Sequence, residues 1–306
     1  MFIQFIKKNL KKFKISYIIK DYFDIPKLEK IITSILPECN CIDVGASYFE
    51  HSKWRVFLKS KKINWISVDP NAQNLTYLKD WRWESELKVI NHGLSQNGGE
   101  VTLYVTNVDS GSSIKKPKIP ASMKMRLVNE SYFFPYKEKK IITKSLKTLI
   151  EENYNLNPFF IKLDTQGTEL DILKGADLFF KNFQILGIEL ETSLLTQPFY
   201  ENANKFADVI NFFGEKGYEL ININVFDLYS TSNITSRNNF FPNEADVVFL
   251  PRLDIIKELP LNYKLSIIGF MYSYKLYNQI KFLIKYNSDL EQALLNRRVN
   301  LLKLIK

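Results

Sequence analysis

Three carboxylates of this chain each end a short apolar run of the sequence. Asp43, Asp69 and Asp164 follow such runs. In an open α/β sheet, ligands bind at the carboxyl ends of the strands, so we expect these side chains to face a common site. Gly45 and Gly167 follow two of them, and glycine lets a backbone turn tightly beside a ligand.

The segment around Asp43 and Asp69 has the layout of a nucleoside-binding crossover. A glycine turn after the first strand would bring backbone N–H groups to the ligand, and a carboxylate after the second strand would accept both ribose hydroxyls. A dinucleotide site prefers three glycines, so that pyrophosphate reaches a helix N-terminus. Only Gly45 is present, followed by Ala46 and Ser47. This favours a nucleoside without pyrophosphate, and S-adenosylmethionine is the expected cofactor.

The run from Phe159 to Ala176 predicts a strand, a carboxylate, a glycine turn and a helix. Thr168 and Asp171 have the spacing of a capping box at the start of that helix. Glu169 lies in the first helical turn, where the helix dipole is a sufficient reason for a carboxylate. An alternative is that Asp164 merely caps the helix.

Four further side chains are candidate proton acceptors. Glu189 and Glu191 lie on one face near the end of a predicted strand, where either can act as a base or hold substrate hydroxyls. His51 and His92 are the only histidines, and imidazole can act as a base near neutral pH. A single histidine is more often an ordinary polar residue of a loop.

Strand and helix patterns alternate along most of the chain, which predicts an α/β fold with a parallel sheet and helices on both faces. Strands are expected over residues 40–44, 65–69, 88–91, 101–106, 141–143, 159–163, 184–191, 218–225 and 245–250. Helices are expected over residues 26–36, 50–60, 147–152, 203–216 and 272–306, with another beginning at 72–78. The long connection at 107–136 is expected to be a lid or binding loop.

Several short motifs, in this order and spacing, resemble the FkbM-type, S-adenosylmethionine-dependent methyltransferases over about residues 40–250. The motifs are Ile42-Asp43-Val44-Gly45-Ala46-Ser47, Val68-Asp69-Pro70-Asn71, Asn91-His92-Gly93-Leu94-Ser95, Gly111-Ser112-Ser113-Ile114, Ser145-Leu146-Lys147-Thr148-Leu149-Ile150, Ile161-Lys162-Leu163-Asp164-Thr165-Gln166-Gly167-Thr168-Glu169 and Leu173-Lys174-Gly175-Ala176. The chain departs from the family at Ser47, where Asn is usual, and at Gln166, where Glu is frequent. The missing carboxylate at 166 weakens the case for a metal, and no metal ligand is expected.

The resemblance implies a class I methyltransferase fold, with a seven-stranded, mostly parallel sheet whose last strand is antiparallel. It also implies O-methylation, typically of sugars or polyketides. From the residues and the resemblance together, we expect Asp164 and Glu189 to be catalytic. The expected cofactor-binding residues are Asp43, Gly45, Ala46, Ser47, Asp69, Pro70, His92, Gly93 and Asp164.

Length and composition suit a soluble domain with two helical extensions. The chain has 306 residues, 45% of them hydrophobic, and a net charge of +9. We expect a basic amphipathic helix over residues 1–25, a methyltransferase domain over 26–252 and a helical extension over 253–306. The first of these either packs on the protein's own core, which is the commoner case, or lies on an anionic membrane surface.

The cysteines and the apolar runs of the sequence indicate the cellular compartment. Cys39 and Cys41 are expected to be buried free thiols in a reducing compartment. No apolar run reaches the length of a membrane span, and the N-terminus does not have the pattern of a signal peptide. We therefore expect a cytoplasmic protein with at most peripheral membrane contact.

Other functions fit the sequence less well. The basic charge would suit a nucleic-acid methyltransferase, but Asn157-Pro158-Phe159-Phe160 precedes its strand, whereas base methylation places a similar motif after it. A glycosyltransferase would need an Asp-x-Asp metal motif at a strand end. A degenerate methyltransferase fold acting as a scaffold remains open, because Gly45 lacks its partner glycines. We expect a carbohydrate or other hydroxyl-bearing acceptor and no nucleic acid.

Overall fold

The structure is a computed structural model that describes residues 26–47, 51–118, 134–152, 158–226, 242–297, 299 and 301–304. The helix expected over residues 1–25 lies outside the described residues. So does the part of the expected 107–136 loop from 119 to 133.

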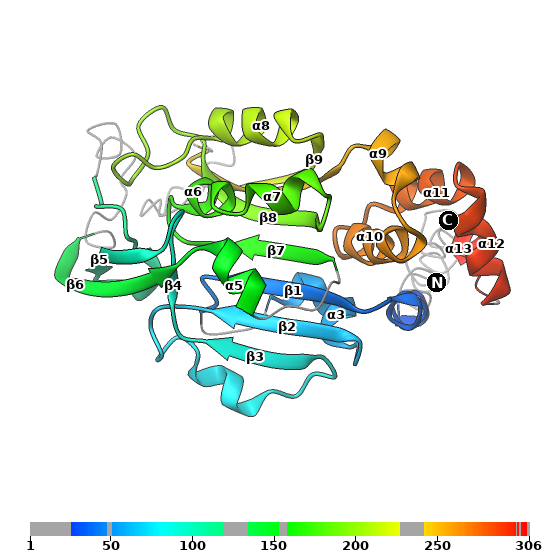
Figure 1. Cartoon of the computed structure of the whole chain (residues 1–306), viewed down its shortest axis with the longest axis horizontal. Coiled ribbons are helices and arrows are strands. Elements are labelled where there is room, and N and C mark those ends of the chain that lie inside the picture. Colours follow the sequence, from blue (N-terminus) through cyan, green and yellow to red (C-terminus); the bar gives the residue numbers. More distant parts are fainter. Residues whose placement is uncertain are drawn as a thin grey trace, which may run out of the picture.

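A seven-stranded sheet forms the centre of the molecule, in the order β3-β2-β1-β7-β8-β10-β9 (Figure 1). Its strands are β1 (Cys39–Val44), β2 (Ile63–Val68), β3 (Glu86–Ile90), β7 (Phe159–Leu163), β8 (Ile185–Ser193), β9 (Tyr218–Phe226) and β10 (Glu244–Pro251). Strand β10 runs antiparallel to both of its neighbours, and the other pairings are parallel. This confirms the expected class I methyltransferase fold.

Hydrophobic cores cover both faces of the sheet, because alternate side chains of its central strands point to opposite sides. On β1, Ile42 and Val44 belong to the core under the helices that follow the strands, whereas Cys39 and Cys41 belong to the opposite core. Both cysteines are buried and free, as expected. The helices on the first side are α5 (Leu146–Glu152), α6 (Glu169–Lys174), α7 (Asp177–Lys181) and α8 (Phe206–Glu215).

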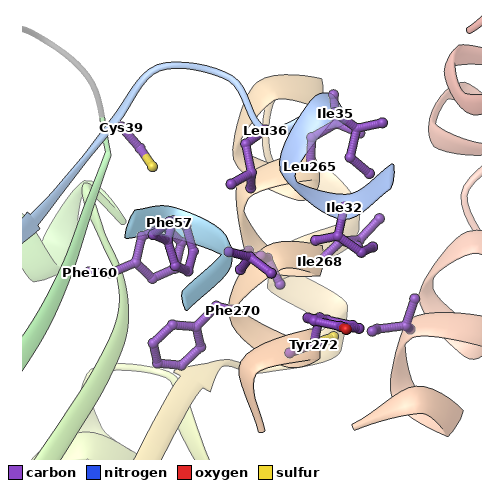
Figure 2. Close-up of a cluster of buried hydrophobic side chains, with 14 of the residues drawn as sticks. Ile32, Ile35, Leu36, Cys39, Phe57, Phe160, Leu265, Ile268, Phe270 and Tyr272 are labelled. Atoms are coloured by element: carbon purple, nitrogen blue, oxygen red, sulfur yellow. The ribbon is translucent and has the colours of Figure 1, made fainter. Parts of the chain in front are cut away.

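The opposite core is shared with the C-terminal helices. It joins α3 (Arg55–Leu58) and the helix over residues 26–35 to α9 (Leu253–Glu258), α10 (Leu261–Ser273), α11 (Tyr277–Lys285), α12 (Ser288–Asn296) and α13 (Leu301–Leu304). Figure 2 shows Phe160 of the sheet close to Phe270 of α10, and their rings stack with centroids 4.9 Å apart. A Cβ at Gly187 of β8 would lie 2.8 Å from both rings, so this glycine permits the close approach.

Within the expected extension over residues 253–306, the sequence shows a helical pattern only from about Tyr272. In the structure α9 already begins at Leu253 and α10 begins at Leu261. Nine consecutive residues of α10, from Lys264 to Tyr272, are buried. A helix that is buried on all sides has no polar face, so the amphipathic period that reveals a surface helix is absent.

A second, three-stranded sheet stands at one end of the main sheet, opposite the C-terminal helices (Figure 1). It has the order β4-β6-β5, with β4 (Gly93–Leu94), β5 (Gly99–Thr106) and β6 (Pro135–Lys144). The chain enters it directly after β3, so it adjoins the carboxyl ends of the parallel strands. The strands expected at 101–106 and 141–143 belong to this sheet.

Two expected helices are shorter than predicted. The segment 50–60 contains the 3-10 helix η1 (Ser52–Trp54) and the short α3, and the segment after Ala72 forms only a turn and the 3-10 helix η2 (Thr76–Asp80). At the start of the second segment, the Asn71 side chain accepts a hydrogen bond from the Gln73 amide. Such local bonds compete with helix formation. Among the described helices, none is both long and apolar enough to cross a membrane.

Candidate active site

A cavity lies at the carboxyl ends of β1, β2 and β7, beside the three-stranded sheet. Seven of the residues expected to bind the cofactor line it: Gly45, Ser47, Asp69, Pro70, His92, Gly93 and Asp164. Asp43 and Ala46 do not line it. Ala46 is buried and packs against Leu75 and Leu78.

The turn after β1 is held by the backbone at the end of β2. The N–H groups of Gly45 and Ala46 both donate to the carbonyl oxygen of Val68, at 2.9 and 3.2 Å. Both amides are therefore engaged with β2 in this structure, and the expectation that the turn presents backbone N–H groups to a ligand stays a prediction. Gly45 has φ +78°, and a Cβ there would lie 1.9 Å from the carbonyl oxygen of Asp164. Glycine is needed because the turns after β1 and β7 pack against each other.

Ser47 carries an unsatisfied polar atom in the wall of the cavity. Its Oγ is buried and has no hydrogen-bond partner in the part of the chain that the structure describes. Buried hydroxyls in native proteins nearly always have a hydrogen-bond partner, so a ligand atom could supply the partner that this hydroxyl lacks.

Asp69 has one carboxylate oxygen held by its neighbours. Oδ1 accepts hydrogen bonds from the Asn71 backbone amide at 2.7 Å and from Asn74 Nδ2 at 3.2 Å. Both hydrogen bonds found on this carboxylate among the described residues fall on Oδ1. Burial raises the pKa of Asp69 to about 7, against the opposing effect of these two donors. A carboxyl group with this pKa changes charge near neutral pH.

A row of alternating charges crosses three adjacent strands beneath the cavity. In register, Asp43 on β1 pairs with Lys162 on β7, and Lys162 pairs with Glu189 on β8. Lys162 Nζ lies 3.5 Å from Asp43 Oδ1 and 3.4 Å from Asp164 Oδ2. Burial opposes the charge of Lys162, but Asp164 and Asp43 outweigh it and raise the pKa of Lys162 above its usual value. Asp43, which we expected to bind the cofactor, pairs with this lysine and does not line the cavity.

Gln166 links the two carboxylates at the ends of β7 and β8. Its Nε2 donates to Asp164 Oδ1 at 2.9 Å and to Glu191 Oε2 at 3.0 Å, while its Oε1 accepts from the Tyr200 hydroxyl at 3.0 Å. Gln166 adopts the left-handed conformation, with φ 58°. A donor at this position holds the two acidic side chains together, which a third carboxylate could not do.

The acidic side chains around Gln166 differ in their pKa values. Burial alone would raise the pKa of Asp164, but the Lys162 ammonium outweighs it and lowers that pKa. Burial and the neighbouring Glu244 raise the pKa of Glu191 well above its usual value. Glu191 is therefore a poor proton acceptor in the free protein. Within the described residues, no group of three or more His, Cys, Asp or Glu side chains has an arrangement that could hold a metal ion.

Glu189, expected to be catalytic, lies in a separate buried network and does not line the cavity. His51 Nε2 is 2.6 Å from Glu189 Oε2, Lys53 Nζ is 2.6 Å from Oε1, and the Tyr274 hydroxyl donates to Oε2. Burial opposes ionisation of Glu189, but His51 and Lys53 outweigh it and lower its pKa to about 2. An anion held this firmly is a weak base, so the geometry favours a structural part for Glu189.

Sequence reasoning missed Lys53, Tyr200 and Tyr274. Tyr274 follows α10, and its hydroxyl also accepts a hydrogen bond from Trp54 Nε1 at 2.7 Å. Tyr200 donates to the carbonyl oxygen of Gly111 at 2.7 Å as well as to Gln166. No local pattern marks these tyrosines, because their partners are far away in the chain.

The helix after β7 begins differently from the prediction. Thr168 makes no side-chain cap to the helix, and Asp171 pairs with Lys115 Nζ at 2.7 Å, so the expected capping box does not form. Glu169 Oε1 instead accepts three hydrogen bonds, from Thr165 N and Oγ1 and from Gly167 N. The buried Glu169 therefore shapes the turn that carries Gln166.

A family model of the methyltransferase FkbM domain matches residues 43–220, more than half of the chain. This chain belongs to the FkbM methyltransferase family. The matched range contains the end of β1, β2 to β8, the whole cavity and Glu189, and it ends before α10 and Tyr274. No curated protein matched this FkbM-family chain.

The chain is also similar to solved methyltransferase structures. Precorrin-6y C5,15-methyltransferase from Geobacter metallireducens is 11% identical, with 74% of this chain and 89% of that chain covered and a TM-score of 0.31. An S-adenosylmethionine-dependent methyltransferase from Anabaena variabilis is 12% identical, with 76% and 83% covered and a TM-score of 0.32. Because these TM-scores are low, the assignment of the fold rests on the strand order and the family match.

Proposed function

We propose that this FkbM-family methyltransferase uses S-adenosylmethionine to methylate a hydroxyl group on a sugar of a surface glycan or glycoconjugate. The observation that carries the proposal is the cavity at the ends of β1, β2 and β7, in a chain of this family. Among its described lining residues are a carboxylate after β2 and an unsatisfied hydroxyl after β1, which are groups that a nucleoside with an amino-acid tail can engage.

The cavity residues fit this cofactor. The Asp69 carboxylate is placed to accept the ribose hydroxyls, since both of its protein hydrogen bonds fall on Oδ1. Ser47 Oγ is a buried group without a described partner. The cofactor, when bound, supplies a methyl group already activated by a positively charged sulfur. Asp164, on the same cavity wall, is kept ionised by Lys162 and suits a cationic neighbour.

The protein must also orient the acceptor hydroxyl and receive its proton, because alignment and proton removal are the tasks left to the enzyme in this transfer. Asp164 and His92 are described side chains of the cavity that can do so. The Asp164 side chain is 42% exposed, whereas Glu189 is 3% exposed and fully engaged. We therefore assign orientation of the acceptor or of the cofactor to Asp164, with His92 as the second candidate.

Calorimetric titration with S-adenosylmethionine tests the cofactor assignment. Asp69→Ala should weaken binding by about 10–150-fold, the value of a lost charge-assisted hydrogen bond. Asp80→Ala is the matched control, because Asp80 is exposed and lies outside the cavity. Unchanged affinity in Asp69→Ala would refute the assignment of this cavity as the cofactor site.

Deletion of the gene, followed by mass spectrometry of surface glycans, tests the acceptor. The expected result is the loss of a methyl group from a sugar.

We expect no specific binding of DNA or RNA. Phe159 and Phe160, which could resemble a base-binding motif, are buried core residues of β7 and do not follow the strand. Binding through charge alone would weaken steeply with salt. A selective complex in a gel shift at physiological salt would refute the sugar proposal.

We also propose that the protein is cytoplasmic and touches membranes through its first residues. Five lysines between Lys7 and Lys14 alternate with the apolar stripe Phe2, Ile6, Leu10 and Phe13. Deleting residues 1–20 should reduce binding to anionic vesicles without changing cofactor affinity. A deletion variant that unfolds would show that the stripe packs on the protein instead.

A further inference from the structure

Two lysines stand at the mouth of the cavity on one face of β6. Lys137 and Lys139 are two residues apart in a strand, so their side chains point to the same side. Their partners in register on β5, Val105 and Leu103, line the same cavity. Both lysines line the cavity and remain exposed to solvent.

The charged side chains of this cavity differ in whether they have hydrogen-bond or ion-pair partners. Across the described residues, neither the Lys137 nor the Lys139 side chain takes part in a hydrogen bond or an ion pair. Lys140, their neighbour on the other face of β6, pairs with Glu100 at 3.7 Å. The described carboxylates of the cavity all accept hydrogen bonds already: Asp69 from Asn71 and Asn74, Asp109 from Asn71, and Asp164 from Gln166. Within the described lining, the ammonium groups of Lys137 and Lys139 are therefore the charged groups for which no partner is found, and they offer positive charge to a ligand at the mouth.

The surroundings of the two lysines strengthen their electrostatic attraction for an anion. Leu103 is buried and forms an apolar wall beside Lys139, and an apolar wall reduces the screening of a nearby charge by water. An ammonium group acts as a point charge without the fixed geometry of a guanidinium, so it can bind either a carboxylate or a phosphate.

We propose that Lys137 and Lys139 bind an anionic oxygen group of the acceptor, so that the enzyme selects an acidic sugar over a neutral one. This inference rests on the proposed function, because it concerns the acceptor of the same cavity. The anionic group is a carboxylate or a phosphate, and the test separates the two.

The test is a ligand-observed NMR titration of the full-length protein with glucuronate, glucose 6-phosphate and glucose, with and without S-adenosylhomocysteine. The wild type should bind at least one anionic probe about tenfold or more tightly than glucose, as expected for one charge-assisted contact. The stronger of the two anions identifies the chemical class. The double variant Lys137→Gln/Lys139→Gln should bind all three probes alike, whereas the control Lys140→Gln should keep the preference.

Three results would overturn the inference. One is a wild type that binds glucose as tightly as both anions. Another is a preference that survives in the double variant or disappears equally in Lys140→Gln. The third is a double variant that loses affinity for S-adenosylmethionine, which would assign the lysines to the carboxylate of the cofactor.

Failure of the proposed function gives a different result. If the wild type binds neither S-adenosylmethionine nor S-adenosylhomocysteine, the methyl-transfer proposal fails. The titration without cofactor then still decides whether Lys137 and Lys139 form an anion site.

Discussion

The hydroxyl of Tyr274, directly after α10, donates a hydrogen bond to the buried carboxylate of Glu189 on β8. Glu189 lies within the range matched by the family model, and Tyr274 lies beyond it. The C-terminal helices thus share a hydrophobic core with the sheet and also complete a polar network beneath the site.

Tyr274→Phe should destabilise the protein by about 1–3 kcal/mol, the cost of leaving buried polar groups without partners. The change deprives Glu189 of a donor and Trp54 Nε1 of its acceptor. Urea unfolding measures the effect. Tyr286→Phe is the matched control, because the Tyr286 side chain is 52% exposed. Equal stability of the two variants would show that the hydroxyl of Tyr274 contributes nothing.

Gly45→Ala should destabilise the fold by about 2–5 kcal/mol, from positive-φ strain together with overpacking. The added Cβ would collide with the Asp164 carbonyl. Gly214→Ala serves as the control, because no atom lies within 4 Å of a Cβ at that exposed position of α8. It should gain about 0.5–1 kcal/mol, since alanine favours a helix. Thermal unfolding of both variants checks the pair, and a neutral Gly45→Ala would contradict the close packing of the two turns.

Affinity for S-adenosylmethionine should fall as the pH falls below about 7. The pKa of Asp69 in the free protein is raised to about 7 by burial. Below that pH the carboxyl is protonated and must lose its proton to accept both ribose hydroxyls. The affinity should therefore drop about tenfold per pH unit. Calorimetry between pH 5.5 and 8.5 measures this slope.

Asp69→Asn is the control for that slope, because an amide does not titrate. Glu169 and Glu244 also have pKa values of about 7, so a slope that persists in Asp69→Asn would assign the titration to one of them.

Asp164→Asn should reduce methyl transfer by about 10²–10⁴-fold, the range of acid–base and orienting groups. The substitution keeps the shape and removes a charge that neighbours Lys162 and faces the cavity. The melting temperature should change little. If Asp164 only caps a turn, the change would cost at most about 1 kcal/mol and turnover would stay normal. Turnover with the identified acceptor separates the two results, and Asp80→Asn controls for the loss of one acidic side chain.

The sequence alone was sufficient for the strands of the main sheet and for seven of the residues that line the cavity. Buried parallel strands are short apolar runs, and strand ends marked by Asp43, Asp69 and Asp164 can be recognised without a structure. Because parallel strands end at the same edge, residues at these ends were expected to meet. The motifs also predicted the family, which the match over residues 43–220 shows.

Only the tertiary structure decided which acidic side chain does what. Asp43, Asp164 and Glu189 look alike in the sequence, each near the end of a strand. Their environments differ because Lys162 lies between Asp43 and Asp164, and because His51, Lys53 and Tyr274 surround Glu189. Burial and partners set the pKa of a carboxylate, and those partners come from segments far apart in the chain. The same reason hid the start of α10 and the separation of the strands near 101–106 and 141–143 into a small sheet, since packing and not local pattern sets their neighbours.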